Sequence, residues 1–276
     1  MKRQKISAIF LRIAVYLASI ITVSALLFVV GYILVKGVPN LSLKLFEWEY
    51  NTDNLSLLPA LLNTILMTGL SLLIAVPLGV FAAIYLVEYA KRGSKLVRLI
   101  RMNAETLAGI PSIVYGLFGM LFFVTALKLG FSMLSGALTI SIMILPVILR
   151  TSEEALMSVP DSFREGSFGL GAGRLRTVFR VVLPDAIPGI LAGVILGVGR
   201  TVGETAALLY TAGTSSDTVS GIMDSARTLS VHMYALSQEG LYINQTYATA
   251  VVLLIIVVGI NALSATVAKR VTRRKI

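Results

Sequence analysis

Six long apolar runs constrain this chain more than any other feature of its sequence. A helix needs about 20 mostly apolar residues to cross the hydrocarbon core of a bilayer, and each run approaches or exceeds that length. The pattern predicts an all-α membrane protein with six transmembrane helices. The runs cover residues 13–35, 60–87, 104–127, 131–149, 186–212 and 247–268.

Composition agrees with this fold class and narrows it. Apolar residues make up 56% of the chain and charged residues 14%, and the mean hydropathy is +0.86, whereas soluble domains average about 25% charged residues. We expect a single transmembrane domain over residues 1–276 with a core at 60–268. Cysteine is absent and His232 is the only histidine, which excludes a disulfide framework and a multi-histidine metal site. His232 falls in a polar outer loop and is expected at the surface.

The distribution of cationic residues predicts the orientation. Nineteen of the 24 lysines and arginines lie in four segments, residues 2–12, 91–101, 150–180 and 269–275. Six spans place all four segments on one side of the membrane. Because cytoplasmic loops carry an excess of Lys and Arg, we expect both termini in the cytoplasm. The first run is longer than the apolar part of a signal peptide, so we expect it to remain as a membrane anchor.

One cytoplasmic segment, residues 150–184, is long and patterned enough to have its own structure. Two stretches with an apolar face, the second rich in arginine, flank the sequence GLGAG at 169–173. The pattern predicts a helix, a glycine turn and a second helix that ends at Pro184. Physical chemistry alone leaves two readings open: amphipathic helices resting on lipid headgroups, or a docking surface for a soluble protein.

The spacing within this segment resembles the EAA motif of bacterial ABC importer permeases, E-A-A-x3-G-x9-I-x-L-P. Every position is matched or filled by a small or isosteric residue: Glu165, Gly166, Ser167, Gly171, Val181, Leu183 and Pro184. The resemblance implies a coupling helix that inserts into a groove of an ATPase subunit. Gly171 would supply a turn without a Cβ atom.

Two charged residues, Arg200 and Glu204, interrupt the fifth apolar run. Four residues apart on one helix, they would face the same way, and each costs about 2.5–3.5 kcal/mol at the bilayer centre. One reading is structural: an ion pair that ties the fifth span to its neighbours. The other reading places both residues on a permeation path, which is where intramembrane charge is usually found.

The residue types favour an anion as the transported species. Arginine is always charged and offers a planar fork of donors that fits an oxyanion. Glu204 would hold Arg200 in place and lower the net positive charge, so that the anion can leave again. Thr201 and Thr205 would add hydroxyl donors to this substrate path.

Two stretches, GRTVGETAALLYTAG at 199–213 and LAGIPSIVYGLFG at 107–119, resemble signatures of the phosphate-specific ABC importer permeases, the PstA and PstC pair. The resemblance covers the chain from around residue 56 onward and is greatest to PstA. It implies the type I importer permease fold, in which a peripheral N-terminal helix joins five core helices. The transport-critical arginine of the family maps to Arg200, with Glu204 as its partner. Pro111 is expected to kink the third span, with Ser112 and Tyr115 as candidate lining residues.

The resemblance implies a permease subunit of an ATP-driven importer of inorganic phosphate in the bacterial cell membrane. The chain lacks the G-x-x-x-x-G-K-S/T motif that binds nucleotide phosphates. We therefore expect a non-catalytic subunit without a cofactor or metal, and ATP-Mg in a partner ATPase. The expected partners are a PstC-like second permease, two PstB-like ATPase subunits, a PstS-like extracytoplasmic phosphate-binding protein and membrane lipid, but no nucleic acid.

Alternatives remain open at the level of sequence. Another oxyanion, such as sulfate or molybdate, would suit Arg200 equally well. A gradient-driven transporter or channel would not need the EAA segment and would often show inverted repeats, which the sequence does not display. A role in signalling phosphate status could coexist with transport.

Overall fold

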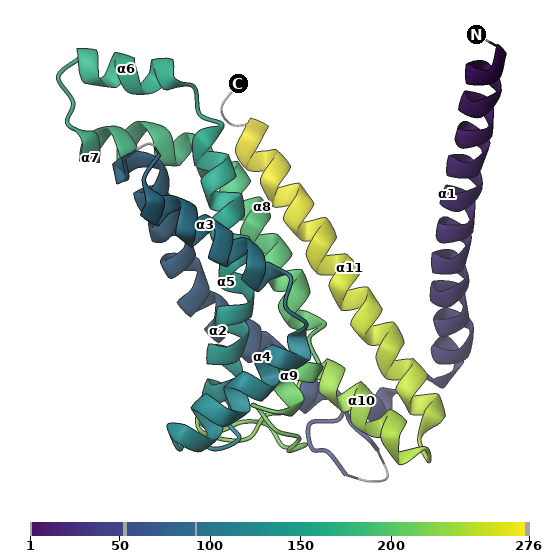
Figure 1. The fold of residues 1–276 in the computed structure, drawn as a ribbon. Helices are drawn as coiled ribbons and strands as arrows, with labels where there is room; N and C mark the ends of the chain where they lie inside the picture. Colours follow the sequence, from purple (N-terminus) through teal and green to yellow (C-terminus); the bar gives the residue numbers. More distant parts are fainter. Residues whose placement is uncertain (1, 52–53, 92, 274–276) are drawn as a thin grey trace.

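The structure is a computed structural model that describes residues 2–51, 54–91 and 93–273 (Figure 1). Side chains are described from residue 11 to 263, apart from 52–53 and 92, and at residue 266. Most of the terminal cations counted above therefore lie outside the described side chains. The α-helices are α1 (Lys2–Gly37), α2 (Leu58–Ile84), α3 (Lys95–Ala108), α4 (Ser112–Gly119), α5 (Met133–Met157), α6 (Asp161–Gly169), α7 (Arg174–Thr177), α8 (Leu183–Val202), α9 (Ala206–Leu209), α10 (Leu229–Glu239) and α11 (Ile243–Arg273). Short 3-10 helices, η1 (Val38–Asn40) and η2 (Leu43–Phe46), follow α1, and π-helical segments are η3 (Tyr85–Tyr89), η4 (Met120–Ala126) and η5 (Val178–Val182).

The predicted spans correspond to helices of the structure. Within the described residues, five helices are long and apolar enough to cross a membrane, and the bent pair of α3 and α4 brings the number to six. Each predicted apolar run overlaps one of them. The all-helical fold class is thereby confirmed, and the described residues hold five candidate spans, or six when the bent pair is counted as one span.

The third span has the predicted position but a different shape. The chain breaks between α3 and α4, and the two parts meet at 102°. Proline has no N–H and disfavours helical backbone in the residue before it, so the kink expected at Pro111 is a full break. The Tyr115 hydroxyl donates to the Leu107 carbonyl across the break at 2.7 Å, which ties α4 to the end of α3.

The fifth span ends earlier than predicted. We expected a continuous run over 186–212, but α8 stops at Val202, and Gly203 begins a turn before the one-turn helix α9. Gly203 favours the end of the helix because glycine has a low helix propensity. A hydropathy average does not register this propensity. At its other end the span begins earlier than predicted. Segments α7, η5 and α8 form one continuous helix from Arg174 to Val202.

Helices α2, α5 and α8 form the centre of the bundle, and α11 packs along α8 (Figure 1). Helix α1 stands apart, and none of its most apolar 18-residue window is buried. Its contacts lie near its end, where the Tyr32 ring packs edge-on against Tyr247 with 5.8 Å between centroids. A Cβ atom at Gly37 would collide with the Tyr247 backbone, so glycine allows α1 to touch the start of α11.

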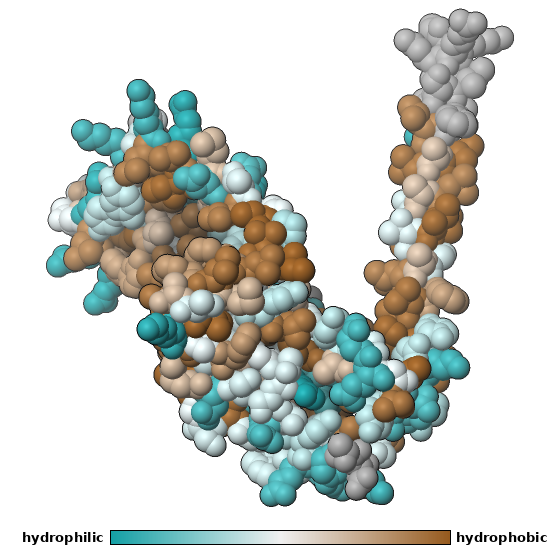
Figure 2. All heavy atoms as spheres, turned by 60° about the horizontal axis from the view of Figure 1, so that its bottom comes forward, coloured by the Kyte–Doolittle hydropathy of each residue, from teal (hydrophilic) through white to brown (hydrophobic). Residues whose placement is uncertain are grey.

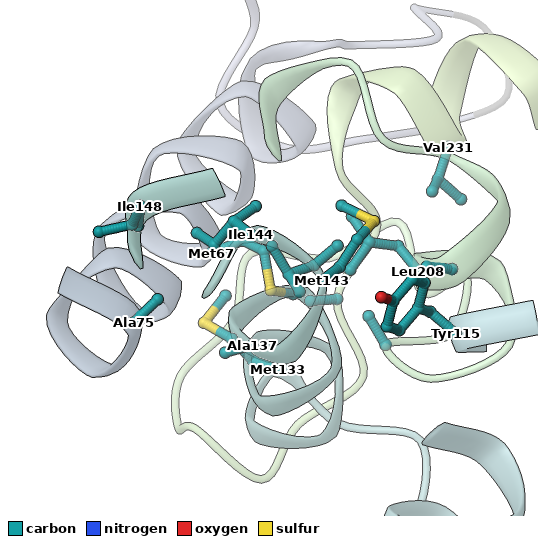
Figure 3. Packing of buried hydrophobic residues seen from close by; sticks show 14 residues of the cluster. Met67, Ala75, Tyr115, Met133, Ala137, Met143, Ile144, Ile148, Leu208 and Val231 are labelled. Carbon is teal, nitrogen blue, oxygen red and sulfur yellow. The ribbon is translucent and has the colours of Figure 1, made fainter. Parts of the chain in front are cut away.

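The main hydrophobic core lies where α2, α5, α4 and α9 meet (Figure 3). Met67 of α2, Met143 and Ile144 of α5 and Leu208 of α9 are fully buried there. Tyr115 of α4 lies beside Leu208 in Figure 3. Burying each such side chain contributes about 1.5–3 kcal/mol, so this cluster fixes α9 and the break before it against the bundle.

The two ends of the bundle differ in character. The start of α1, the end of α11 and helices α6 and α7 lie at the same end (Figure 1), as six spans require. Figure 2 shows hydrophilic side chains gathered over the opposite end and apolar ones along α1 and the flank of the bundle. An apolar belt between polar ends is the surface that a bilayer-spanning protein presents.

His232 lies on α10 and is 1% exposed, so the prediction of a surface residue was wrong. Its ring meets the Tyr50 ring edge-on with 5.9 Å between centroids, and Nδ1 lies 3.4 Å from Arg227 Nη1. Burial, and secondarily the Arg227 guanidinium, lowers the pKa of His232 to about 4. Tyr50 lies in the other outer loop, between η2 and α2, and a contact between two separate loops is not reported by any local sequence pattern.

Candidate transport path and coupling surface

Arg200 lies in the last turn of α8, directly before the helix break, and is half-buried. Among the described residues its guanidinium takes part in no ion pair. It interacts electrostatically with Tyr115 of α4. A charge in the membrane region that lacks an acidic partner keeps its capacity to attract an anion.

Glu204 lies in the break between α8 and α9 and is 8% exposed. Its Oε1 accepts a hydrogen bond from the Ala207 N–H of α9 at 3.1 Å. Its backbone carbonyl accepts from the Ser230 hydroxyl of α10 at 2.6 Å. The carboxylate therefore caps α9 in the manner of N-terminal capping residues, and its backbone is fastened to α10.

The predicted ion pair between Arg200 and Glu204 is not formed. The two residues were expected four apart on one helix, but α8 ends at Val202 and Glu204 lies beyond that end. Its carboxylate turns to the otherwise unpaired N–H groups of α9, because the first N–H groups of a helix have no intrahelical partner. The alternative in which the pair ties the fifth span to its neighbours thereby loses its geometric basis.

The two threonines of the predicted substrate path differ in availability. Thr201 is 2% exposed, and its hydroxyl donates to the Gly197 carbonyl one turn earlier at 2.9 Å. A hydroxyl has one proton to donate, so Thr201 has none left for a substrate in this conformation. Thr205 is half-buried in the break itself, beside Glu204.

The second broken helix lies against the first break. A Cβ atom at Gly116 of α4 would be 2.9 Å from Cα of Ala207 on α9, which is closer than side chains pack. The backbones of α4 and α9 therefore touch at this glycine. The two breaks, at 109–111 and 203–205, are thus held together by α4.

At the opposite end, the EAA segment forms the predicted helix, turn and helix. Helix α6 has no buried residue, and Gly171 in the turn has φ +81°. That left-handed conformation costs other residues about 1 kcal/mol or more, so the requirement for glycine at 171 is confirmed. The apolar side chains of this segment are largely exposed: Phe163, Phe168, Leu170, Leu175 and Phe179.

The remaining motif positions fit the packing of this segment. Ser167 of α6 hydrogen-bonds the Thr177 hydroxyl of α7 at 2.8 Å, which joins the two helices. A Cβ atom at Gly166 would meet nothing within 4 Å, so the alanine of the motif would fit there. Glu165 is exposed, whereas Val181 is half-buried in η5.

Pro184 does not end the second helix as predicted. It follows Leu183 in the first turn of α8, and the backbone passes into α8 from η5 without a break. The π-helical η5 supplies the local adjustment that accommodates a proline within a continuous helix. The second helix of the EAA segment and the fifth span therefore form one continuous helix.

One charged pair at this end was missed from the sequence. Glu88, in η3 at the end of α2, pairs with Arg164 of α6, with 2.7 Å between Oε1 and Nη2. The residues are 76 positions apart in the chain, so spacing gives no signal. The cations nearest to Glu88 in the sequence are Lys91 and Arg92, and neither indicates a pair with Arg164.

Comparison with known proteins agrees with this arrangement. Residues 75–276 match the family described as binding-protein-dependent transport system inner membrane component. The chain is 32% identical to the probable ABC transporter permease YqgI of Bacillus subtilis, over 76% of each chain. It is 36% identical to the phosphate transport system permease PstA 1 of Mycobacterium tuberculosis, over 78% of this chain and 71% of that protein.

The fold is also that of solved ABC transporters. A chain of a bacterial alginate ABC transporter, crystallised with an alginate-bound periplasmic protein, superposes with a TM-score of 0.60 over 91% of this chain and 95% of its own, at 16% identity. The chain belongs to the family of binding-protein-dependent transport system inner membrane components, the multi-pass permeases of bacterial ABC importers.

Proposed function

We propose that this chain is a permease subunit of an ATP-driven importer of inorganic phosphate and that Arg200 binds the anion as it crosses the membrane. The observation that carries the proposal is the position of Arg200, in the membrane region at the junction of two helix breaks and without an ion-pair partner among the described residues. Relatives named as phosphate permeases, with 31–36% identity, support phosphate as the anion.

The contacts of Glu204 change the role assigned to it. By capping α9 and fastening the break to α10, it positions the segment that follows Arg200. Its negative charge near the path still lowers the attraction for an anion, which favours release. The Thr205 hydroxyl then remains as a candidate donor beside Arg200, because the Thr201 hydroxyl donates to the Gly197 carbonyl within α8.

The coupling segment supplies the contact with an ATPase. Exposed apolar groups, above all Leu170 at 91% exposure, suit insertion into a protein groove better than exposure to water. ATP-Mg would bind in that partner and this chain would remain non-catalytic. In this arrangement Glu165, Gly166, Ser167 and Gly171 shape α6 and its turn, and Val181, Leu183 and Pro184 continue into the fifth span.

The complete importer requires further chains. One coupling segment per permease and two ATPase subunits call for a second permease related to PstC. An extracytoplasmic phosphate-binding protein would deliver the anion to the polar end that carries α10. The coupling end, with both chain termini, would face the cytoplasm, as the excess of Lys and Arg in its loops supports.

Labelled phosphate uptake in cells lacking this chain, with and without the chain restored, tests the proposal. We expect uptake to return on restoration, to be blocked by unlabelled phosphate and to be unaffected by excess sulfate or molybdate. Return of labelled sulfate or molybdate uptake in place of phosphate would show a different oxyanion. Uptake that persists with a hydrolysis-deficient ATPase partner would contradict ATP-driven import and favour a gradient-driven transporter.

A further inference from the structure

The contact of α6 with the ends of α2 and α5 is made by Arg164. No residue of α6 is buried, so an apolar core does not hold this helix. Two of its residues are half-buried: Ser167 contacts α7, and Arg164, with 14% of its side chain accessible, pairs with Glu88, which has 8%. An ion pair this enclosed in an otherwise exposed helix calls for an explanation.

Arg164 uses its donors on three structural elements. Nη2 lies 2.7 Å from Glu88 Oε1 and Nε lies 3.1 Å from the same oxygen. Nη1 donates to the Val159 carbonyl at 2.6 Å, and Nη2 donates to the Leu156 carbonyl at 2.9 Å. The planar fork of arginine, which lysine cannot reproduce, thereby joins α6 to the end of α5 and to the end of α2.

The pair lies beside a hollow in the structure. A cavity of about 930 Å³ separates parts of α6 from the ends of α2 and α3, and both Glu88 and Arg164 line it. A movement of α6 therefore reaches α2 directly through Arg164 and Glu88.

Helix α2 leads from this pair to the other end of the bundle. Near its start, Asn63 donates to the carbonyls of Asp217 and Arg227 in the outer loop, at 3.2 and 3.3 Å. The Thr64 hydroxyl accepts from the Leu229 N–H at the start of α10, at 2.8 Å. The same helix thus touches the coupling helix at one end and, at the other, the loop that follows α9.

We propose that the Arg164–Glu88 pair is the positioning contact through which movement of the ATPase subunits is passed from α6 to α2 and so to the outer loop. The inference rests on the proposed function, because it presupposes an ATPase docked on α6. Arg164 and Glu88 act through other groups and touch neither nucleotide nor anion. Their loss should separate ATP hydrolysis from transport without preventing either protein from folding.

The test uses the complete complex in proteoliposomes with loaded binding protein, and measures phosphate uptake and ATP hydrolysis together. For Arg164→Gln and Glu88→Gln we expect an assembled complex with near-normal basal hydrolysis, and a ratio of uptake to hydrolysis reduced about tenfold. Arg164→Lys, which keeps the positive charge beside Glu88 but not the planar fork, should recover part of the ratio. Arg150→Gln, which removes an exposed pair with Glu154 at the same end, is the matched control and should leave the ratio unchanged.

Two results would overturn the inference. One is an assembled Arg164→Gln complex with the wild-type ratio of uptake to hydrolysis. The other is loss of assembly in Arg164→Gln and Glu88→Gln and also in Arg164→Lys, which would make the pair a folding contact. A third result concerns the proposed substrate instead. If the wild-type complex hydrolyses ATP on addition of its binding protein but takes up no phosphate, phosphate is not the substrate. The ratio of uptake to hydrolysis can then be measured with the anion that is transported.

Discussion

Gly116 of α4 and Ala207 of α9 meet backbone to backbone, since a Cβ atom at Gly116 would lie 2.9 Å from Cα of Ala207. Close approach through a small residue is a common way for membrane helices to pack. Here it joins two broken helices, so that the segment after Arg200 cannot move without α4. The contact therefore fixes the geometry of the candidate path.

Replacement of Gly116 by valine should separate α4 from α9. We expect a loss of about 1–3 kcal/mol in the free energy of unfolding from overpacking, together with loss of uptake. Thermal unfolding of the purified complex in detergent and phosphate uptake in cells measure the two effects. Gly69→Ala is the control, because a Cβ atom there would meet nothing within 4 Å; equal behaviour of the two variants would contradict the close contact.

The positions of Arg200 and Glu204 predict different outcomes for their amide variants. Arg200→Gln should reduce uptake to background while the complex still assembles, because the charge is lost and no ion pair is broken. Glu204→Gln keeps an oxygen acceptor for the Ala207 N–H and should retain part of the activity, whereas Glu204→Leu should cost about 1 kcal/mol for the lost cap. Uptake and co-purification of the partner subunits report both. Equal loss in Arg200→Gln and Glu204→Gln would favour the ion pair after all.

The turn after α6 requires glycine at 171. Gly171→Ala, with φ +81° at that position, should cost about 1 kcal/mol locally, and Gly171→Pro should abolish coupling because proline fixes φ near −65°. The readout is co-purification of the ATPase with the permease and ATP hydrolysis stimulated by the binding protein. Gly166→Ala has free space for its Cβ atom and should behave as wild type. Normal coupling in Gly171→Pro would exclude the docking role.

His232 should make the folded chain sensitive to acid. Its pKa is lowered to about 4 in the folded state, below the usual value of about 6.5, so the unfolded chain binds the proton first. Stability is full above pH 6.5 and is lost as the pH falls from 6.5 toward 4, by about 2–3 kcal/mol for this group. Unfolding curves of wild type and His232→Phe between pH 7.5 and 4.5 measure the difference. Parallel curves for the two proteins would refute the assignment.

Long-range apolar patterning was sufficient to predict the spans, because a bilayer leaves few alternatives to the apolar helix. The EAA spacing likewise predicted the helix and turn around Gly171, since the turn is set by local backbone chemistry. Hydropathy did not predict the break in the fifth span. The apolar run continues beyond Gly203, so the average hydropathy gives no sign that α8 ends at Val202. A capping signal was present, however, in Glu204 three residues before Ala207.

Contacts between distant parts of the chain could not be predicted from spacing. Glu88 and Arg164 meet only because α6 returns to the end of α2. His232 is buried in part by Tyr50, which lies in the loop before α2 and packs against the ring. In both cases a charged or titratable residue in a polar stretch looked like an ordinary surface group, and only the tertiary fold decides otherwise.

The separation of α1 from the bundle has a consequence for assembly. Helix α1 diverges from α11 (Figure 1), and its apolar side chains are exposed along its length (Figure 2). In a bilayer the space between the two helices would hold acyl chains or another apolar helix. A second membrane subunit that packed there would displace lipid as apolar as itself, so its association would gain little from the hydrophobic effect. Which subunit associates there would then depend on how closely the shape of its surface matches the space between α1 and α11.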